Sequence, residues 1–392
     1  MSELSIKEKD RLYIANTYNR FPVEIVRGKG SLLYDDTGKE YIDMGAGIAV
    51  STFGAADPEW IEAVTSQAGK FQHTSNLYYS SPCVLLAEEL IKRTGMKKVF
   101  FSNSGAEANE CAIKTARRYS ELKYGTDAKR YKIITMDKGF HGRTLATLAA
   151  TGQEAFHQSF LPVTDGFVYA KTDDLDDVVR LVDEGGCCAI MIETICGEGG
   201  VLPLSPEFIR GVAELAEKRD LLLIIDEVQT GNGRTGKLYS YMNFDIKPDI
   251  VSTAKGLAGG LPLGATLLGE KVGDVLTAGT HGSTFGGNPI CCAAAMSVLS
   301  RITDDLLAEV KAKGEYIKTV LTASEDVVSV TGMGLMIGIE FKRPTPEVVA
   351  ECRERGLLVL TAKNKVRLLP ALNIPWGLLE RAVEILKEAG QE

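Results

Sequence analysis

Six short runs of apolar residues recur through the middle of the chain, separated by segments of mixed polarity. Continuous apolar runs of this length are typical of strands buried on both faces of a sheet. A helix is predicted over 205–220, because Ser205 can cap it, Pro206 suits its first turn and its apolar residues have helical spacing. This β-α-β pattern predicts a mostly parallel sheet covered by helices. The runs are KKVFF from 97, KIITM from 132, CCAIMIE from 187, LLLIIDE from 221, DIVSTA from 249 and GATLLG from 264.

The pattern changes near both ends of the chain. After residue 287 a long helical stretch is followed by strand-like runs within 327–341 and 355–372 and by a final amphipathic helix. Near the start, 27–44 has the pattern of a hairpin with a polar turn. We therefore predict an α/β fold in three parts. They are a large domain over 51–287, a smaller α+β domain over 288–392, and an N-terminal segment over 1–50 that is part of the smaller domain.

Composition narrows the classes of function. The 392 residues are 45% hydrophobic and 24% charged, with a formal net charge of −8. Because no cluster of basic residues is expected to neutralise phosphates, nucleic acid is not expected as a partner. The charged N-terminus lacks the apolar core of a signal peptide, and no apolar run approaches the ~20 residues of a membrane span. We therefore expect a cytoplasmic protein with no membrane association. The eight cysteines include no C-x-x-C pair and are expected to be reduced structural thiols, and the four histidines lack zinc-ligand spacing.

Polar residues follow the apolar runs repeatedly, at the points where the predicted strands end. They lie at 102–105, at 140–143 and at Glu193, Asp226 and Lys255. In open α/β sheets, ligands bind beyond the carboxyl ends of the strands. A solvated acid at the start of a loop would account for Asp226 alone, but not for polar residues at so many strand ends. The sequence therefore predicts a binding crevice with Asp226 at its floor.

Two further features indicate the chemistry of this crevice. Ser104 and Glu107 have capping-box spacing, and Gly105 and Ala106 would expose backbone N–H groups to an anion at the helix start, although capping alone would also explain Ser104. Lys255 lies among apolar and small residues, where burial would lower its pKa and make its amine nucleophilic, whereas most lysines are solvated. A buried carboxylate, a phosphate site and an activated lysine together suit pyridoxal 5'-phosphate.

Two glycine-rich segments superficially resemble nucleotide-binding loops. The segment 231–238, GNGRTGKL, has the P-loop spacing of Gly231, Gly236 and Lys237, but Leu238 replaces the Ser or Thr that binds magnesium. A nucleotide-binding α/β protein that uses GNGRTGK is the alternative from a different class. GMGLMIG, at 332–338, has one residue too many for a dinucleotide loop, so we predict a glycine turn between strands.

The chain resembles the class III, or ornithine-type, aminotransferases over nearly its whole length, and most of all those that act on acetylornithine in arginine biosynthesis. The motifs of this resemblance are NTYNRFPV, NSGAEANE, FHGRT, GEGG, DEVQTGNGRTG, TAKGLAGGLPLGA, HGSTFGGNP, GMGLMIG and VRLLP. The resemblance implies a fold type I, pyridoxal-phosphate-dependent homodimer with two active sites at the subunit interface. The presence of both Asp226 and Lys255 argues against a catalytically silent relative.

Roles in cofactor binding are implied by position in these motifs. Lys255 is expected to form the Schiff base with the cofactor and then to move the proton between substrate and cofactor carbons. Asp226 is expected to keep the pyridine nitrogen protonated, and Gln229 to reach the ring hydroxyl. The remaining contacts are Phe140 and Val228 on the two faces of the ring, and Gly105, Ala106 and, from the partner subunit, Thr284 on the phosphate.

Roles in substrate binding follow in the same way. Arg143 resembles a clamp for a substrate carboxylate, because an arginine can hold a carboxylate bidentately. Glu198 is expected to pair with Arg367 when the amine donor binds and to release it for the second carboxylate of glutamate. Ordinary solvated charges would be the alternative for this pair. The remaining residues expected near the substrate are Ser283, Tyr18 and Ile48.

Several positions depart from the family motifs. Thr194 and Cys196 replace a proline and a glutamine, Ala55 and Asp57 replace two histidines, and Ala106 stands where a threonine is common. Ile48 stands where ornithine aminotransferases have a tyrosine, and an aliphatic residue there suits an acylated amino group. We therefore expect transfer of the terminal amino group of N2-acetyl-L-ornithine to 2-oxoglutarate, with succinylornithine, ornithine, succinyldiaminopimelate and 4-aminobutyrate as alternative donors.

Overall fold

The apolar runs of the middle of the chain form one seven-stranded sheet. In the computed structural model, which describes residues 4–391, the strand order is β4-β12-β11-β10-β7-β5-β6. All neighbouring strands are parallel except β12, which is antiparallel to both β11 and β4. The mostly parallel sheet predicted from the sequence is therefore confirmed. The strands are β4 (Lys98–Ser102), β5 (Lys132–Met136), β6 (Phe167–Ala170), β7 (Cys187–Ile192), β10 (Leu222–Asp226), β11 (Ile250–Thr253) and β12 (Gly264–Leu268).

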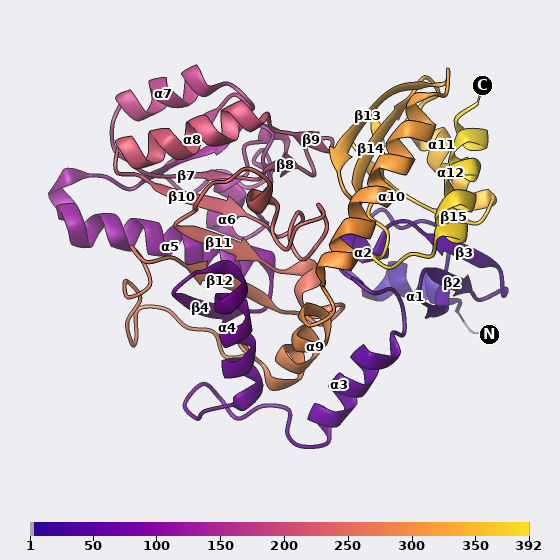
Figure 1. Cartoon of the computed structure of the whole chain (residues 1–392), viewed down its shortest axis with the longest axis horizontal. Coiled ribbons are helices and arrows are strands. Elements are labelled where there is room, and N and C mark those ends of the chain that lie inside the picture. Colours follow the sequence, from indigo (N-terminus) through magenta and orange to yellow (C-terminus); the bar gives the residue numbers. More distant parts are fainter. Residues whose placement is uncertain (1–3, 392) are drawn as a thin grey trace.

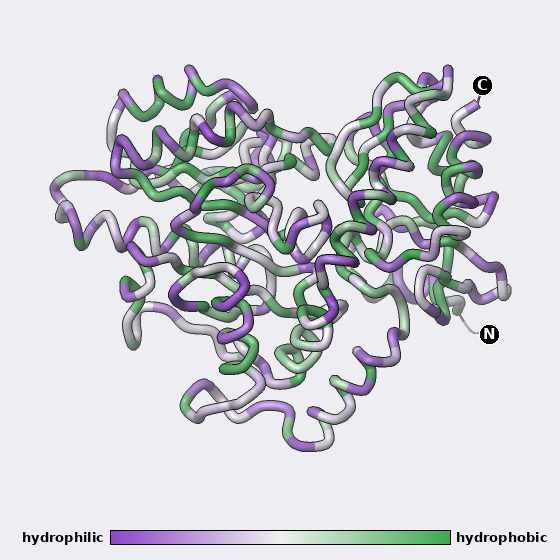
Figure 2. The backbone as a smooth tube through the Cα atoms, viewed as in Figure 1, coloured by the Kyte–Doolittle hydropathy of each residue, from purple (hydrophilic) through white to green (hydrophobic). Residues whose placement is uncertain are grey.

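Helices cover both faces of this sheet (Figure 1). On one face, α5 packs its buried side chains Ala112, Ile113 and Ala116 against strands β5, β7, β10 and β11. The predicted helix at 205–220 is present, and Ser205 Oγ accepts a hydrogen bond from the N–H of Phe208 at 3.2 Å. Figure 2 shows the strands as mostly hydrophobic between more hydrophilic outer segments. The helices around the sheet are α3 (Pro58–Ala68), α4 (Ser81–Thr94), α5 (Gly105–Tyr124), α6 (Leu145–Ala150), α7 (Leu175–Asp183), α8 (Pro206–Lys218) and α9 (Pro289–Leu299).

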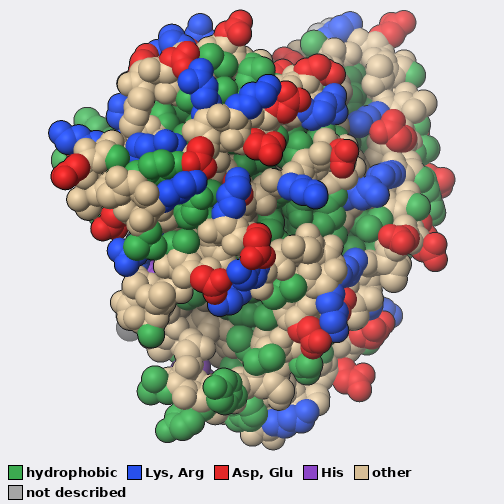
Figure 3. All heavy atoms as spheres, turned by 60° about the vertical axis from the view of Figure 1, so that its left-hand side comes forward, with side chains coloured by type: hydrophobic (Ala, Val, Ile, Leu, Met, Phe, Trp, Pro, Cys, Tyr) green, Lys and Arg blue, Asp and Glu red, His purple; other side chains and the backbone are tan. Residues whose placement is uncertain are grey.

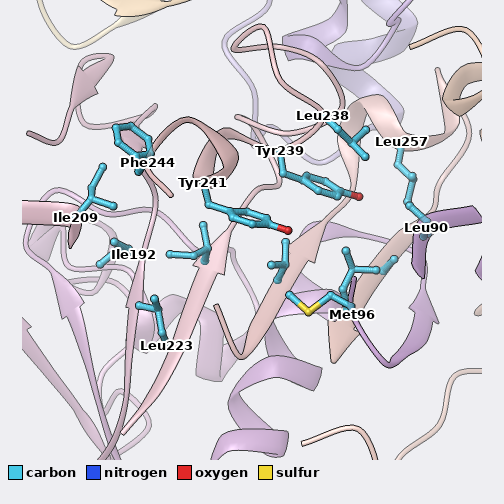
Figure 4. Packing of buried hydrophobic residues seen from close by; sticks show 14 of the residues in the cluster. Leu90, Met96, Ile192, Ile209, Leu223, Leu238, Tyr239, Tyr241, Phe244 and Leu257 are labelled. Atoms are coloured by element: carbon cyan, nitrogen blue, oxygen red, sulfur yellow. The ribbon is translucent and has the colours of Figure 1, made fainter. Parts of the chain in front are cut away.

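A second layer of core lies on the face of the sheet opposite α5 (Figure 4). Tyr239 and Tyr241 stack there with ring centroids 6.2 Å apart, beside Leu238 and Leu257. The buried acid Glu227 anchors this segment, because its carboxylate accepts hydrogen bonds from Ser240 Oγ at 2.6 Å and the N–H of Tyr241 at 2.8 Å. Glu227 is thus a structural acid, whereas its neighbour Asp226 faces the other way, into the crevice described below.

The two ends of the chain form a smaller body with its own core. It lies on the right of Figure 1, where the yellow and orange C-terminal elements meet the indigo N-terminal strands. Ile42 and Met44 pack there with residues of α10, β14 and α12. The glycine turn predicted at 332–338 is confirmed, because Gly334 (φ +55°) lies between β13 and β14. The predicted hairpin at 27–44 is a three-stranded meander, β1 to β3, which β15 extends.

The bounds of these elements complete the description. The strands are β1 (Ile25–Lys29), β2 (Leu32–Asp35), β3 (Glu40–Asp43), β8 (Ile195–Cys196), β9 (Leu202–Pro203), β13 (Val327–Met333), β14 (Met336–Phe341), β15 (Leu357–Leu358), β16 (Leu360–Ala362) and β17 (Lys365–Leu368). The helices are α1 (Ile6–Tyr13), α2 (Ala46–Ala49), α10 (Asp304–Thr322), α11 (Thr345–Glu354) and α12 (Trp376–Gly390). The domain boundaries at residues 50 and 287 remain a prediction.

Other sequence expectations concern features that span the chain. Within residues 4–391, no helix is long and apolar enough to cross a membrane. All eight cysteines are free thiols, and all but Cys83 are buried. The described residues contain no cluster of His, Cys, Asp and Glu side chains that could hold a metal ion.

Candidate active site

Asp226 lies at the carboxyl end of β10, at the centre of the sheet. Its side chain is almost fully buried, with 3% exposed. Asp226 Oδ1 accepts a hydrogen bond from the N–H of Val228 at 2.9 Å, and Oδ2 accepts one from Asn109 Nδ2 at 2.7 Å. Since buried polar groups need hydrogen-bond partners, these bonds satisfy the Asp226 carboxylate and fix its orientation.

His141 supplies the third partner of Asp226, and the sequence did not predict it. His141 Nδ1 lies 2.8 Å from Asp226 Oδ2, and because a carboxylate only accepts, this nitrogen carries the proton. Burial opposes protonation of the ring, but the hydrogen bond and charge of Asp226 outweigh it and raise the pKa of His141. Nε2 is buried without a partner in the described residues. Asn109 joins the two by also donating to the carbonyl of His141 at 2.8 Å.

Glu193 is a second buried acid close to Asp226. It follows β7, is 5% exposed, and its Oε2 accepts a hydrogen bond from the N–H of Phe140 at 2.9 Å. Burial, and after it the charge of Asp226, raises the pKa of Glu193 to about 8. The site therefore holds one carboxylate that donors stabilise and one carboxyl group that stays protonated near neutral pH.

Lys255 enters the same crevice from the end of β11. Its backbone is left-handed (φ +41°), and neighbouring polar groups fix the turn: Asn232 Nδ2 donates to the carbonyl of Ala254 at 3.1 Å, and Thr52 Oγ1 donates to that of Gly256 at 2.7 Å. Burial lowers the pKa of Lys255, although the charges of Glu198, Glu193 and Asp226 oppose this. Within the described residues its amine has no hydrogen-bond partner, so a poised nucleophile faces the acids.

The N-terminus of α5 borders the crevice and presents free backbone donors. Within residues 4–391, the N–H groups of Gly105 and Ala106 have no acceptor, as the first turn of a helix allows. Residue 105 is confined to glycine, because a Cβ there would lie 2.6 Å from Val228 Cγ1. The predicted capping box is only half correct. Ser104 Oγ accepts from the N–H of Glu107 at 3.1 Å, but the Glu107 carboxylate turns to the N–H of Asn103 at 2.7 Å instead of that of Ser104.

Glu198 and Arg367 form an ion pair at the edge of the crevice. Arg367 Nη1 donates to Glu198 Oε1 at 2.5 Å and to Gln229 Oε1 at 3.1 Å, while Gln229 Nε2 donates to Glu198 Oε1 at 3.2 Å. Burial acts to raise the pKa of Glu198, but the charge and hydrogen bond of Arg367, together with the charge of Lys255 and the hydrogen bond from Gln229, outweigh it and lower that pKa. Two residues 169 positions apart are thus brought together, and Gln229 is bound between them.

The remaining predicted residues are exposed or partly exposed to solvent. The Arg143 guanidinium is exposed and lies over the ring of Phe156 at 4.3 Å and over that of Phe140 at 5.4 Å. It has no carboxylate partner among residues 4–391. Ser283 Oγ accepts from Asn103 Nδ2 at 3.1 Å, which places it beside the start of α5. Thr284, Ile48 (40%) and Tyr18 (70%) are exposed, and their roles near cofactor and substrate remain predictions.

Comparison with known proteins identifies the family. The class-III aminotransferases match residues 13–389. The chain belongs to this family. An acetylornithine aminotransferase of Haemophilus ducreyi is 48% identical over 394 residues, which cover 100% of both chains. Among solved structures, an ornithine aminotransferase from Toxoplasma gondii matches with a TM-score of 0.93 at 30% identity, over 97% of this chain and 93% of that one. An N-acetylornithine aminotransferase from Stenotrophomonas maltophilia matches with a TM-score of 0.83 at 34% identity, over 97% of each chain.

As a class-III aminotransferase, the protein is an enzyme that depends on pyridoxal 5'-phosphate, and its crevice fits that cofactor. The open N–H groups at the start of α5 suit the phosphate, and the oriented carboxylate of Asp226 suits a protonated ring nitrogen. The unpartnered amine of Lys255 suits the aldehyde. This aminotransferase therefore presents groups of the right kind for the phosphate, the ring nitrogen and the aldehyde of the cofactor.

The GNGRTGK segment of the aminotransferase is a structural connection, so the nucleotide-binding alternative is not favoured. Arg234 is 2% exposed, and its Nη1 donates to the carbonyls of Leu335 at 3.2 Å and Pro370 at 2.5 Å. A Cβ at Gly236 would lie 2.3 Å from Lys311 Cγ, which shows how closely α10 covers the loop. The loop therefore joins the sheet to the smaller body and leaves no open cradle for phosphates.

The departures from the family motifs also have structural partners. Asp57 caps α3 by accepting from the N–H of Trp60 at 2.9 Å, and it pairs with Arg301 at 2.8 Å. Thr194 Oγ1 lies 2.5 Å from Ser240 Oγ, in the segment that Glu227 anchors.

Proposed function

We propose that the enzyme transfers the terminal amino group of N2-acetyl-L-ornithine to 2-oxoglutarate, giving N-acetyl-L-glutamate 5-semialdehyde and L-glutamate, in the cytoplasm. The observation that carries the chemistry is the convergence of Lys255, Asp226 and the open start of α5 in one crevice. For the donor, support comes from relatives 40–48% identical over nearly the whole chain that are named acetylornithine aminotransferases.

In this proposal each polar group has one task. The bound cofactor supplies an electron sink for the carbon that loses its proton. Asp226 holds a proton at the ring nitrogen, and its own position is held by Asn109 and His141. The amine of Lys255 takes the proton from the substrate carbon and returns it to the cofactor, and burial favours this role because it lowers the pKa of the amine. Phe140 and Val228 flank the ring, and Gly105, Ala106 and the partner subunit's Thr284 bind the phosphate.

Substrate carboxylates have two receptors in this proposal. Arg143 is available for the α-carboxylate of the donor, because its guanidinium is exposed and lacks a carboxylate partner in the described part of the chain. Arg367 remains neutralised by Glu198 while the donor is bound. A dicarboxylate such as 2-oxoglutarate would compete with Glu198 for Arg367, and Gln229 would then be released as well. Ser283 lies close to the same space.

The preference for an acylated donor rests on Ile48, because Tyr18 is a tyrosine that acetylornithine and ornithine aminotransferases can share. Ile48 lies in a left-handed turn (φ +65°) with 40% of its surface exposed, which is a strained conformation for a β-branched residue. An aliphatic side chain held there suits an acyl group better than a free ammonium. The TM-score of 0.93 with an ornithine aminotransferase reflects the shared fold and does not bear on this choice.

We also propose that the enzyme is a homodimer. Large apolar side chains gather at the lower edge of the face in Figure 3, around the connection between α3 and α4. Contiguous exposed apolar surface of this kind is typical of protein interfaces. Light scattering should give twice the 42.4 kDa mass of the chain, and a monomer would contradict the shared site. The exposed residues are Leu77, Tyr78, Tyr79, Val84, Leu85 and Phe285.

Initial-rate kinetics tests the function. Two half-reactions that share one site predict parallel double-reciprocal lines for donor and 2-oxoglutarate, and a higher kcat/KM for N2-acetyl-L-ornithine than for L-ornithine, succinyldiaminopimelate or 4-aminobutyrate. Intersecting lines would contradict the two-step exchange, and a better donor would replace the proposed one. Lys255→Ala should bind cofactor without turning over, whereas retained turnover would remove Lys255 from the chemistry.

A further inference from the structure

A basic pocket lies on the far half of α5, away from the crevice. It has a volume of about 360 Å³ and is lined by the second half of the helix and the loop that follows. Since α5 rises about 1.5 Å per residue, the pocket begins roughly 15 Å along the helix from the phosphate site at Gly105. The lining residues are Lys114, Arg117, Arg118, Glu121, Gly125, Thr126, Lys129, Arg130 and Tyr131.

The charge of this pocket differs in sign from that of the chain. Five of the lining residues are Lys or Arg and one is Glu, in a protein whose net charge is −8. Figure 3 turns this side of the molecule forward and shows Lys and Arg side chains spread across the upper half of the face, with Asp and Glu side chains among them. The segment 114–132, KTARRYSELKYGTDAKRYK, carries this charge, contrary to the expectation, drawn from the acidic overall balance, that the chain has no such basic cluster.

Most of these cations are not neutralised. Within residues 4–391 only Arg118 pairs with a carboxylate, that of Glu121 at 3.3 Å. Arg117 donates to backbone carbonyls, Arg130 donates to the carbonyl of Asp220 at 2.9 Å, and the ammonium of Lys129 has no partner in the described structure. Clefts lined by charges of one sign concentrate the field and attract counter-ions. The pocket is therefore electrostatically unsatisfied.

The guanidinium groups also retain unused donors. A guanidinium has five N–H groups. Arg118 and Arg130 each use one of theirs on the residues that the structure describes, and the Nε of each is buried without a partner. The hydroxyl of Tyr124, whose ring lies 4.2 Å below the Arg130 guanidinium, is also buried and unpartnered. A planar fork of donors matches the oxygens of phosphate and carboxylate groups.

We infer that this pocket binds a small anion that carries two or more phosphate or carboxylate groups. Its volume suits a small molecule, and its charge requires more than one negative group for neutralisation. A purely structural role is the alternative, because cations near the end of a helix stabilise its negative pole. That role would explain Lys123, the basic residue of the last turn of α5, which does not line the pocket. It does not explain Lys129 and Arg130, which lie beyond the helix end at Tyr124.

Calorimetric titration of the cofactor-saturated enzyme with pyrophosphate, and separately with citrate, tests this inference. Saturation with cofactor keeps the phosphate site of α5 occupied. We expect saturable binding of at least one probe, which weakens as salt rises and falls about tenfold or more in Arg118→Gln and in Lys129→Gln, because each loses a charged contact. If only pyrophosphate binds, the pocket is specific for phosphate groups; if only citrate binds, it is specific for carboxylate groups.

The control is Lys92→Gln, which removes the same charge from α4, where Lys92 is paired with Glu88 at 2.9 Å. It should bind the probe as the unaltered enzyme does. Turnover should be unchanged in all three variants, which shows that they fold. Absence of saturable binding by either probe, or equal affinity in the pocket variants and the control, would overturn the inference. Because turnover is measured separately, this result is independent of the proposed transamination.

Discussion

Replacing His141 with leucine should weaken cofactor binding without removing any group that touches the cofactor in the proposed site. His141 is fully buried and Nδ1 lies 2.8 Å from Asp226 Oδ2. A hydrogen bond to a charged group contributes about 1.5–3 kcal/mol, which corresponds to roughly ten- to a hundredfold in an equilibrium constant. Asp226 keeps its bonds from Asn109 and Val228, so the loss should not exceed that range.

The assay is titration of cofactor-free protein with pyridoxal 5'-phosphate, followed by absorbance. His141→Asn places an amide donor near the position of Nδ1 and should recover part of the affinity. His157→Leu is the matched control, because His157 is also buried but its Nε2 lies 2.9 Å and 2.6 Å from the carbonyls of Leu148 and Thr151. The His157→Leu variant should be less stable to heat but should bind pyridoxal 5'-phosphate with unchanged affinity. Equal affinity in His141→Leu and the unaltered protein would refute the support of Asp226 by His141.

Three further predictions follow from the buried groups and the close packing of the crevice. Because the pKa of Glu193 is raised to about 8, stability should fall as pH rises from 4.5 toward 8, and Glu193→Gln should remove this dependence, with a gain on the order of 1–3 kcal/mol at pH 7. Chemical unfolding at pH 5 and pH 7.5 measures this, and parallel pH profiles would contradict it. Burial lowers the pKa of Lys255, so the charged amine destabilises the folded state. Without cofactor, Lys255→Met should therefore be more stable than the unaltered protein at pH 7 by about 0.5–2 kcal/mol, and this difference in stability should shrink toward pH ~10. A less stable variant in thermal unfolding would refute that. Gly105→Ala should reduce folding stability by about 1–3 kcal/mol and bind cofactor poorly, because the new Cβ would lie 2.6 Å from Val228 Cγ1. Adding Val228→Ala should restore cofactor binding, and failure of that rescue would show that this contact is not the cause of the defect.

The sequence predicted the parts of the site that local pattern determines. Asp226 and Lys255 could be found because each directly follows an apolar strand, and the ends of parallel strands meet at one edge of a sheet. The mostly parallel sheet followed from the same runs. The antiparallel direction of β12 could not be predicted from these runs, because a continuous apolar run has the same pattern in a parallel and an antiparallel strand.

Other parts depend on contacts between distant residues. His141 and Asn109 reach Asp226 across 85 and 117 positions, and no local spacing relates them to it. The Glu198–Arg367 pair was expected only from the family resemblance, for the same reason. The capping box at Ser104 was half wrong because Glu107 can reach either of two neighbouring N–H groups, and the fold of the preceding residue, Asn103, decides between them.

The most direct test of the proposed function is the absorption spectrum of the purified enzyme with pyridoxal 5'-phosphate, recorded during titration with N2-acetyl-L-ornithine and, in parallel, with L-ornithine and 4-aminobutyrate. We expect a visible band that requires Lys255 and that N2-acetyl-L-ornithine bleaches at a far lower concentration than the other amines. A band that another amine bleaches first would contradict the proposed donor. A protein in which the cofactor gives no such band would contradict the assignment of Lys255 and Asp226 altogether.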